Sequence, residues 1–292
     1  MYTGDIKEFT QDVRPQTTAR IFNFHTQKQK KESESRSAST ESTDVLYQRG
    51  KYTSHFQPIV NIGAQGQHIA GFETLSRDKK QPDLPVGEYL NRLRDNNQLF
   101  EHDCQMFENA CEFLSELQRH GNKSSFVSVN FSAQTLSQHD LPAFLEFTLA
   151  QYQLDPSCLK IEITEEEFPE TGRAQILDNI YAIHDRLKMR VAMDDFGTEA
   201  SNEERLSLLG AFISSVKIDK SLLGDADLIA LASSPALKNY EIIVEGVSTD
   251  HQYAMLCNLF EEPAIQAYAL HKPMCKDQAL QIVNEHHSYN FD

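Results

Sequence analysis

The sequence contains no tryptophan, and its cysteines are few, odd in number and widely spaced. None of the five thiols belongs to a CxxC pair, so we expect no zinc site and interpret them as reduced packing residues: Cys104, Cys111, Cys158, Cys257 and Cys275. No apolar run reaches the ~18 residues that a membrane helix requires. The first residues also lack the basic and then apolar pattern of a secretory signal. We therefore expect a cytoplasmic protein without a membrane span.

Positive charge is also scarce. The chain has 27 lysines and arginines against 43 aspartates and glutamates, which gives a formal net charge of −16 over 292 residues. Because contacts with a phosphate backbone need clustered cations, we do not expect DNA or another nucleic acid as the main partner. An acidic chain is compatible with a pocket that concentrates divalent cations. The same charge could serve solubility alone, so net charge does not choose between these two interpretations.

Residues 1–50 differ in composition from the rest of the chain. Residues 26–45 contain almost no apolar side chains and are rich in Lys, Glu, Ser and Thr, so they cannot bury enough surface to offset the entropy of ordering. Residues 1–25 contain scattered apolar positions without a sustained period. They are either a short docking segment or a tail, and we favour the tail. We predict a disordered polar N-terminal tail over residues 1–50 and a folded domain over residues 51–292.

From about residue 46, short β-rich runs alternate with segments of helical spacing. The expected strands cover residues 53–61, 69–75, 126–131, 159–163, 190–194, 214–218, 241–245 and 264–267. Between them, apolar residues from Met106 to Leu117 and from Ile176 to Leu187 recur with the 3.6-residue period of a helix. Strands that alternate with helices favour parallel pairing, and eight of them in about 240 residues fit an α/β fold of the closed (β/α)8 type. The alternative is an open doubly wound sheet, but no glycine-rich phosphate turn follows the first strand.

The predicted strand ends carry a biased set of polar residues. They are Glu73, Asn130, Glu162, Asp194, Asp195, Lys217, Glu245 and Gln266. In such a barrel the loops that follow the strands meet at one mouth, so these side chains should converge there. Each residue alone has a simpler explanation as a loop cap, a turn former or a surface charge. Five carboxylates at one mouth would repel one another strongly without cations, and oxygen ligands suit magnesium, manganese or calcium.

The motifs around these residues resemble the EAL domain family of bacterial cyclic di-GMP phosphodiesterases. The matching stretches are FQPIV (56–60), GFETLSR (71–77), SVNFSA (128–133), KIEITE (160–165), VAMDDFGT (191–198), VKIDKSLL (216–223), IVEGVST (243–249) and IQAYALHKP (265–273). They occur in the order of the family and extend over about residues 52–285. The resemblance implies a TIM-like barrel whose first strand is antiparallel. It also implies an enzyme of second-messenger signalling that hydrolyses cyclic di-GMP to the linear dinucleotide pGpG.

The resemblance further implies a metal centre. Its ligands would be Glu73, Asn130, Glu162, Asp194 and Asp195, with Asp194 shared between two cations. The implied cofactors are two Mg²⁺ or Mn²⁺ ions per site, with Ca²⁺ as an inhibitor. The family also implies a homodimer, although the loop after the aspartate pair has changed in this chain.

Catalytic and substrate-binding roles follow from the same motifs. Lys217 would orient the attacking water, and Glu245 would act as a base or as a further metal contact. Glu165 would steady the loop that follows the aspartate pair. The residues that would bind the cyclic dinucleotide are Gln57, Arg77 and Gln266, and Gln266 would also complete the set of side chains around the metals.

The sequence departs from the family pattern close to the implied ligands. Thr74 replaces the alanine of the Glu-Ala-Leu motif, and Glu199 and Ala200 replace the usual Gly-Tyr after the aspartate pair. Ser248, which we expect to cap a helix, replaces a glutamate, and Ala267 replaces a glycine. Every expected ligand is nevertheless present. We therefore favour a metal-dependent phosphodiesterase, and the alternative is a non-catalytic EAL-like module that binds cyclic di-GMP or a protein partner.

Overall fold

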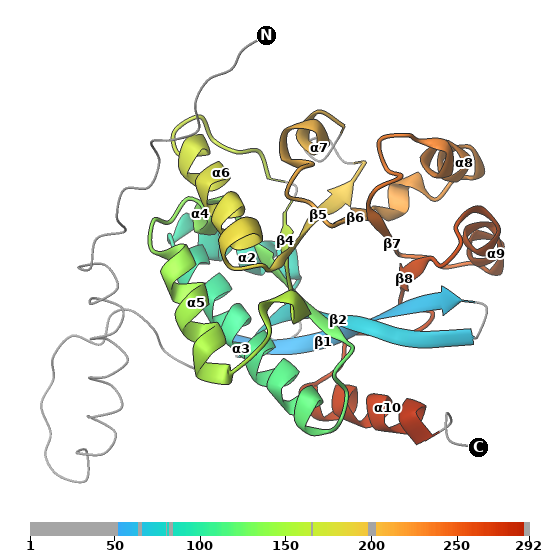
Figure 1. The fold of residues 1–292 in the computed structure, drawn as a ribbon, viewed down its shortest axis with the longest axis horizontal. Helices are drawn as coiled ribbons and strands as arrows, with labels where there is room; N and C mark the ends of the chain where they lie inside the picture. Colours follow the sequence, from blue (N-terminus) through green and yellow to red (C-terminus); the bar gives the residue numbers. More distant parts are fainter. Residues whose placement is uncertain are drawn as a thin grey trace, which may run out of the picture.

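Eight strands form one closed barrel, in which each strand pairs with its neighbour in sequence and the last pairs with the first (Figure 1). The computed structural model describes residues 52–63, 66–79, 81, 84–164, 166–197 and 203–288. The strands are β1 (Tyr52–Gly63), β2 (Gly66–Asp78), β3 (Phe126–Phe131), β4 (Leu159–Ile163), β5 (Arg190–Phe196), β6 (Ser215–Ile218), β7 (Glu241–Glu245) and β8 (Ala264–Gln266). The tail predicted over residues 1–50 lies outside the described residues.

Strand β1 runs antiparallel to both of its neighbours. It pairs with β2, where Gln57 lies opposite Glu73, and with β8, where Val60 lies opposite Ile265. All other neighbouring strands are parallel. The first half of β1 therefore lies beside the second half of β2, at the mouth where the parallel strands end. This arrangement confirms the predicted barrel and its antiparallel first strand.

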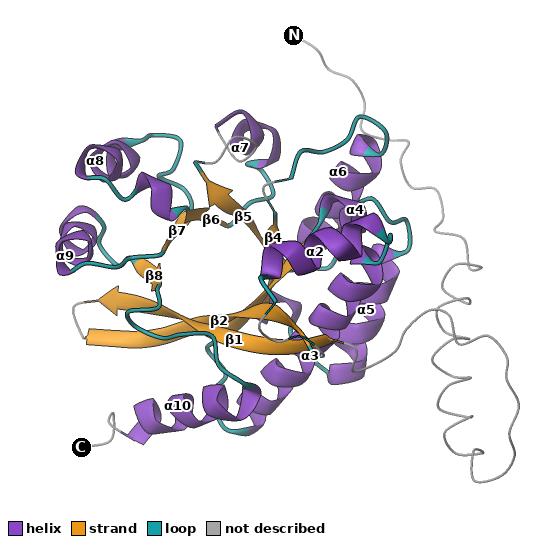
Figure 2. Cartoon of the chain, turned by 180° about the vertical axis from the view of Figure 1, so that it is seen from behind, coloured by secondary structure: helices purple, strands orange, loops and turns teal. Residues whose placement is uncertain are grey.

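Helices cover the outer face of the barrel (Figure 2). They are α2 (Val86–Asp95), α3 (Leu99–Arg119), α4 (Ala133–Leu136), α5 (Leu141–Tyr152), α6 (Arg173–Tyr181), α7 (Glu203–Leu209), α8 (Asp225–Ser233), α9 (Asp250–Leu259) and α10 (Lys276–Ser288), with short 3-10 segments at Pro156–Cys158 and Lys220–Leu222 and a π-helical turn at Ala182–Arg186. The apolar stripe predicted from Met106 to Leu117 lies on α3 and is buried. None of these described helices is both long and apolar enough to cross a membrane.

Side chains close the barrel interior at the end opposite the mouth. Ile59, Phe126, Ile243 and Ala264 form a buried apolar cluster there. Lys160 is buried beside them, and its Nζ lies 2.7 Å from Glu241 Oε2 and 4.0 Å from the centroid of the Phe126 ring. Inward-facing side chains of barrel strands pack in layers. Because this layer is filled, the inward-facing polar groups closer to the carboxyl ends of the strands meet at the mouth.

The Phe126 ring requires a glycine at position 71. A β-carbon at Gly71 would lie 2.7 Å from this ring, whereas nothing lies within 4 Å of the same position at Gly87 in α2. We expect Gly71→Ala to lower the free energy of unfolding by about 1–3 kcal/mol, because it overpacks the core. Gly87→Ala should raise it by up to about 1 kcal/mol, because alanine favours a helix. Urea unfolding measures both variants, and a shift of the same sign in both would contradict the packing argument.

Candidate metal centre at the barrel mouth

Lys217 is the centre of a carboxylate cluster at the mouth of the barrel. It projects from β6 and is 1% exposed. The distances from Lys217 Nζ are 2.7 Å to Glu162 Oε2, 2.8 Å to Asp194 Oδ1, 2.8 Å to Glu245 Oε1 and 3.2 Å to Glu73 Oε2. Strands β4, β5, β7 and β2 therefore each deliver one carboxylate to the same point.

Amide side chains hold the carboxylate of Glu73 from both sides. Asn130 Nδ2 donates to Glu73 Oε1 at 2.6 Å, and Gln266 Nε2 donates to Glu73 Oε2 at 2.5 Å. Gln266 Nε2 also lies 3.2 Å from Gln57 Oε1, and Gln57 Nε2 donates to the carbonyl of His271 at 3.1 Å. Gln57 and Gln266 are both buried. In this geometry, two residues predicted to face the nucleotide also orient a predicted metal ligand.

The cluster carries more carboxylates than one ammonium balances. Burial disfavours the charged form of Lys217, but the surrounding carboxylates outweigh burial and hold its pKa well above the usual value. Burial and the neighbouring Glu73 raise the pKa of Glu162 well above its ordinary range, although Lys217 opposes them. Burial likewise raises the pKa of Glu245 to about 8, despite the Lys217 ammonium. Further positive charge at this point would relieve the repulsion between the carboxylates.

The oxygen atoms of the cluster fit a divalent cation. Asn130 Oδ1, Glu162 Oε1 and Gln266 Oε1 are buried and have no hydrogen-bond partner among the described residues. Buried acceptors are nearly always satisfied, so these atoms have lone pairs that a cation or an ordered water would take. Ligand oxygens of Glu73, Glu162 and Asp194 also lie within 4.8 Å of one another. A donor set made only of oxygen suits Mg²⁺, Mn²⁺ or Ca²⁺.

Asp195 belongs to a second group of oxygens beside the first. Ligand oxygens of Asp194, Asp195 and Glu245 lie within 4.8 Å of one another, so Asp194 is common to both groups. Asp195 has a φ of 49°, and the pairing of β5 with β6 shifts register between Met193 and Phe196. Side chains of a regular strand alternate between its two faces. The irregular backbone instead turns two consecutive aspartates toward one mouth, which supplies donors for a second cation.

The family of this barrel follows from its sequence. The sequence model of the EAL domain matches residues 41–260. The chain belongs to the EAL domain family. This EAL domain is 27% identical over 258 residues to the signaling protein YkoW of Bacillus subtilis, a match that covers 80% of this chain and 30% of YkoW. It is also 27% identical over 248 residues to the bifunctional diguanylate cyclase/cyclic di-GMP phosphodiesterase MucR of Pseudomonas aeruginosa, covering 81% of this chain and 35% of MucR. The EAL domain thus spans about a third of the length of these relatives.

Solved structures share the barrel of this EAL domain. The PaMucR phosphodiesterase in complex with c-di-GMP aligns with a TM-score of 0.68 at 24% identity, and the match covers 79% of this chain and 95% of that chain. An EAL domain protein from Listeria monocytogenes aligns with a TM-score of 0.65 at 23% identity, covering 85% of this chain and 99% of that chain. At these identities the likeness establishes the fold.

Two kinds of predicted site residue stand apart from the carboxylate cluster of the EAL domain. Arg77 lies four residues beyond Glu73 along β2, and its guanidinium donates to the carbonyl of Ser76 at 2.7 Å. It therefore lies at the rim of the mouth, and among the described residues it makes no hydrogen bond or ion pair with the cluster. The other is Glu165, which lies outside the described residues, as do the substituted positions Glu199 and Ala200.

Two of the remaining departures from the family pattern, Ser248 and Ala267, lie in ordinary surroundings. The prediction that Ser248 caps a helix is wrong, because the N-cap of α9 is Thr249, which forms a capping box with Gln252. The box needs its partner three residues after the cap, and Gln252 stands at that distance from Thr249 and not from Ser248. Ala267 is buried, and its φ is not positive, so its β-carbon adds no backbone strain where the family has glycine.

Sequence reasoning missed a buried polar network behind the mouth. His102 and Asp103 on α3 are both 4% exposed. His102 Nε2 lies 2.8 Å from Ser76 Oγ on β2, and Asp103 Oδ2 accepts from the backbone N of Ser132 at 3.0 Å. The dipeptide thus ties together the ends of β2 and β3, which carry Glu73 and Asn130. Polar residues occur along the whole of α3, so the sequence does not distinguish this dipeptide from the others.

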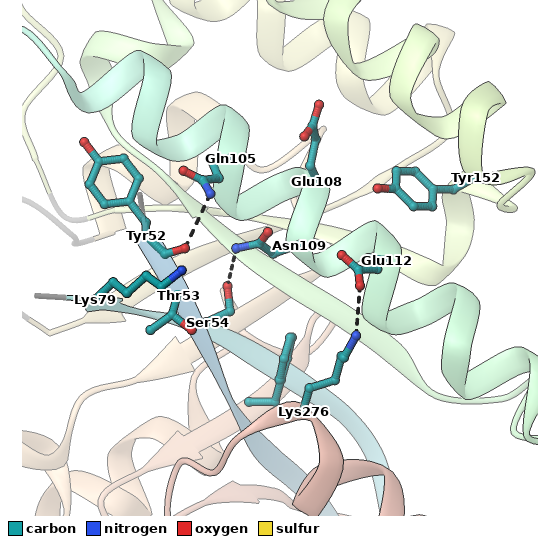
Figure 3. Close-up of a pocket in the computed structure, with 11 residues that line it drawn as sticks. Tyr52, Thr53, Ser54, Lys79, Gln105, Glu108, Asn109, Glu112, Tyr152 and Lys276 are labelled. Carbon is teal, nitrogen blue, oxygen red and sulfur yellow. Dashed lines mark hydrogen bonds and ion pairs between the residues drawn. The ribbon is translucent and has the colours of Figure 1, made fainter. Parts of the chain in front are cut away.

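The pocket in Figure 3 lies outside the barrel of the EAL domain, between β1, α3 and α10. Its volume is about 360 Å³, and none of the predicted site residues lines it. Polar groups in this pocket pair with one another, since Asn109 Nδ2 donates to Ser54 Oγ at 2.8 Å and Lys276 Nζ lies 2.8 Å from Glu112 Oε1. The pocket is therefore separate from the candidate metal centre.

Proposed function

We propose that this EAL domain hydrolyses cyclic di-GMP to the linear dinucleotide pGpG in a reaction that depends on Mg²⁺ or Mn²⁺. The observation that carries the proposal is the meeting of four strand-end carboxylates around Lys217, beside buried oxygen atoms that lack a partner among the described residues. The relatives support the substrate, because MucR is named a cyclic di-GMP phosphodiesterase and its solved phosphodiesterase is a c-di-GMP complex.

The residues of the cluster would hold two cations. Glu73, Asn130, Glu162 and Asp194 surround the first position, and Asp194, Asp195 and Glu245 surround the second. Two cations, when bound, lower the pKa of a water between them and neutralise charge on the phosphodiester oxygens. Gln57 and Gln266 would keep Glu73 in its ligating orientation through their hydrogen bonds.

The remaining residues would handle the water and the phosphate. Lys217 Nζ donates hydrogen bonds and would orient the attacking water in line with one phosphorus. Glu245 would act either as the base that takes up the proton of that water or as a further contact of the second cation. The water oxygen forms the new bond to phosphorus, one P–O ester bond breaks, and the leaving oxygen takes up a proton as the ring opens. Arg77, at the rim, would bind the phosphate oxygens with its planar fork.

Chromatography of the reaction products tests this function. Purified protein is incubated with cyclic di-GMP and Mg²⁺ or Mn²⁺, and the linear product is quantified. We expect pGpG with either metal, at least ~100-fold less after removal of the metal with EDTA, and less with Ca²⁺ alone. No turnover by folded protein with either metal would reject the phosphodiesterase. Calorimetry with cyclic di-GMP then decides the alternative, because binding without turnover supports a receptor.

The predicted role of Glu165 and the predicted homodimer remain predictions. Size measurement in solution, with and without cyclic di-GMP, tests the homodimer. The place in second-messenger signalling also remains a prediction, and the turnover assay tests it.

A further inference from the structure

Arg205 is a buried charged residue that the proposed chemistry does not use. It is 8% exposed and lies on α7, the helix that follows β5 and its aspartate pair. Its guanidinium donates to the carbonyl of Thr164 at 2.8 Å and to the carbonyl of Glu166 at 3.0 Å. The guanidinium carbon also lies 4.5 Å from the centroid of the Phe168 ring. A buried charge is costly without partners, and the two carbonyls and the ring named here belong to the segment that follows β4.

The segment after β4 is also tied to the opposite side of the mouth. Glu166 Oε2 accepts from the backbone N of Ala133 at 3.2 Å, and Glu166 Oε1 forms an ion pair with Arg94 of α2. Ala133 begins α4 and lies three residues after Asn130. Contacts on both flanks therefore fix this segment, from α7 through Arg205 and from α2 and α4 through Glu166.

These contacts join two strands that carry predicted metal ligands. Thr164 lies two residues after Glu162 on β4, and α7 follows Asp194 and Asp195 on β5. The guanidinium is planar, and its two outer nitrogens bond two carbonyl oxygens of the same segment. Moving α7 relative to the end of β4 would break both hydrogen bonds together. A lysine at this position has one nitrogen and no such fork.

We propose that Arg205 is a positioning residue for the metal centre, which fixes the spacing between Glu162 and the Asp194–Asp195 pair by holding the segment after β4 against α7. The inference deepens the proposed function and rests on its claim that the oxygen cluster binds divalent cations. Arg205 touches neither substrate nor reacting atoms, and it acts through the backbone of its neighbours. Contacts behind metal ligands typically change metal affinity by about 10–100-fold, which makes the effect measurable.

The test compares three variants of the full chain. Arg205→Met keeps the contact with Phe168 but loses both carbonyl hydrogen bonds, and Arg205→Lys keeps the charge without the fork. The control is Arg119→Met, because the Arg119 side chain is 69% exposed at the end of α3. Calorimetry measures Mn²⁺ affinity, and hydrogen exchange with mass spectrometry measures local opening. We expect Mn²⁺ to bind about tenfold more weakly to Arg205→Met, less weakly to Arg205→Lys, and unchanged to Arg119→Met.

Hydrogen exchange in the Arg205→Met variant should increase in the peptides that cover β4 with its following segment and α7, and stay unchanged in those of β7 and β8. An unchanged Mn²⁺ affinity with a lower unfolding temperature would show that Arg205 only stabilises the fold, and would overturn the inference. Faster exchange over the whole barrel would overturn it as well. If the wild-type chain binds no Mn²⁺, the proposed function fails on its own, and local exchange then decides whether Arg205 fixes these segments.

Discussion

Glu162→Gln should abolish the turnover of cyclic di-GMP. Loss of a residue that only contacts a metal ligand typically lowers metal affinity or activity by up to ~100-fold, and we expect the loss of activity here to be well above that. Glutamine keeps the shape of this fully buried side chain but removes its charge. One carboxylate oxygen of Glu162 meets Lys217 at 2.7 Å, and the other is a buried acceptor without a partner among the described residues. Steady-state kinetics with Mn²⁺ measures the loss of turnover, and calorimetry measures the loss of Mn²⁺ affinity.

The stability of Glu162→Gln separates a functional loss from a folding defect. Burial and Glu73 raise the pKa of Glu162 well above its usual value, so the fold disfavours the charged form. The variant should therefore be at least as resistant to urea as the wild type when both are measured in EDTA. Glu170→Gln is the matched control, because its side chain is 86% exposed, and it should change neither turnover nor stability. Near-normal turnover in a folded Glu162→Gln protein would exclude Glu162 from the metal site.

Lys217→Met should lose turnover as well, but unlike Glu162→Gln it should also lose much of its stability. The substitution leaves four clustered carboxylates without their shared ammonium. Breaking a buried ion pair by removing one partner typically costs about 3–5 kcal/mol, and we expect a loss of that size in urea unfolding with EDTA. Mn²⁺ should restore part of the lost stability, because a ligand that binds only the folded state stabilises it.

Lys160→Met is the internal control for this prediction. Lys160 is as buried as Lys217, but among the described residues it forms an ion pair with one carboxylate, Glu241, whose side chain is 35% exposed and can be hydrated. Its substitution should therefore cost clearly less stability than Lys217→Met. Equal losses would mean that the burial of any lysine in this barrel matters, and that the carboxylate cluster around Lys217 does not.

Most of the barrel could be predicted from the sequence, because short buried strands and amphipathic helices leave periodic patterns. The predicted strands at residues 126–131, 159–163 and 241–245 agree with the bounds of β3, β4 and β7. Strand β5 continues beyond its predicted end at residue 194, because the register shift near its end keeps Phe196 paired with Ile218. A shift of this kind depends on the neighbouring strand and leaves no period in the sequence.

The convergence of the acidic residues could also be predicted, since the ends of parallel strands meet at one mouth. The partners of each residue could not. Sequence reasoning placed Gln57 beside the nucleotide and Gln266 beside both the nucleotide and the metals. It did not predict that the two residues join in one hydrogen-bonded chain that ends on Glu73. It gave no part to Asp103 or Arg205, whose partners lie on other loops. Contacts of this kind depend on how elements pack, and no local pattern records them.

The sequence by itself determined the order of the elements, the apolar faces that pack around the barrel, and the strand ends that carry acidic side chains. The reason is that burial repeats with the period of each helix or strand and is therefore visible along the chain. Only the tertiary structure decided that Lys217 lies within ion-pair distance of four carboxylates, and that Arg205 links the segment after β4 to α7. These contacts join residues far apart in the chain, and their geometry is fixed by the closure and register of the barrel.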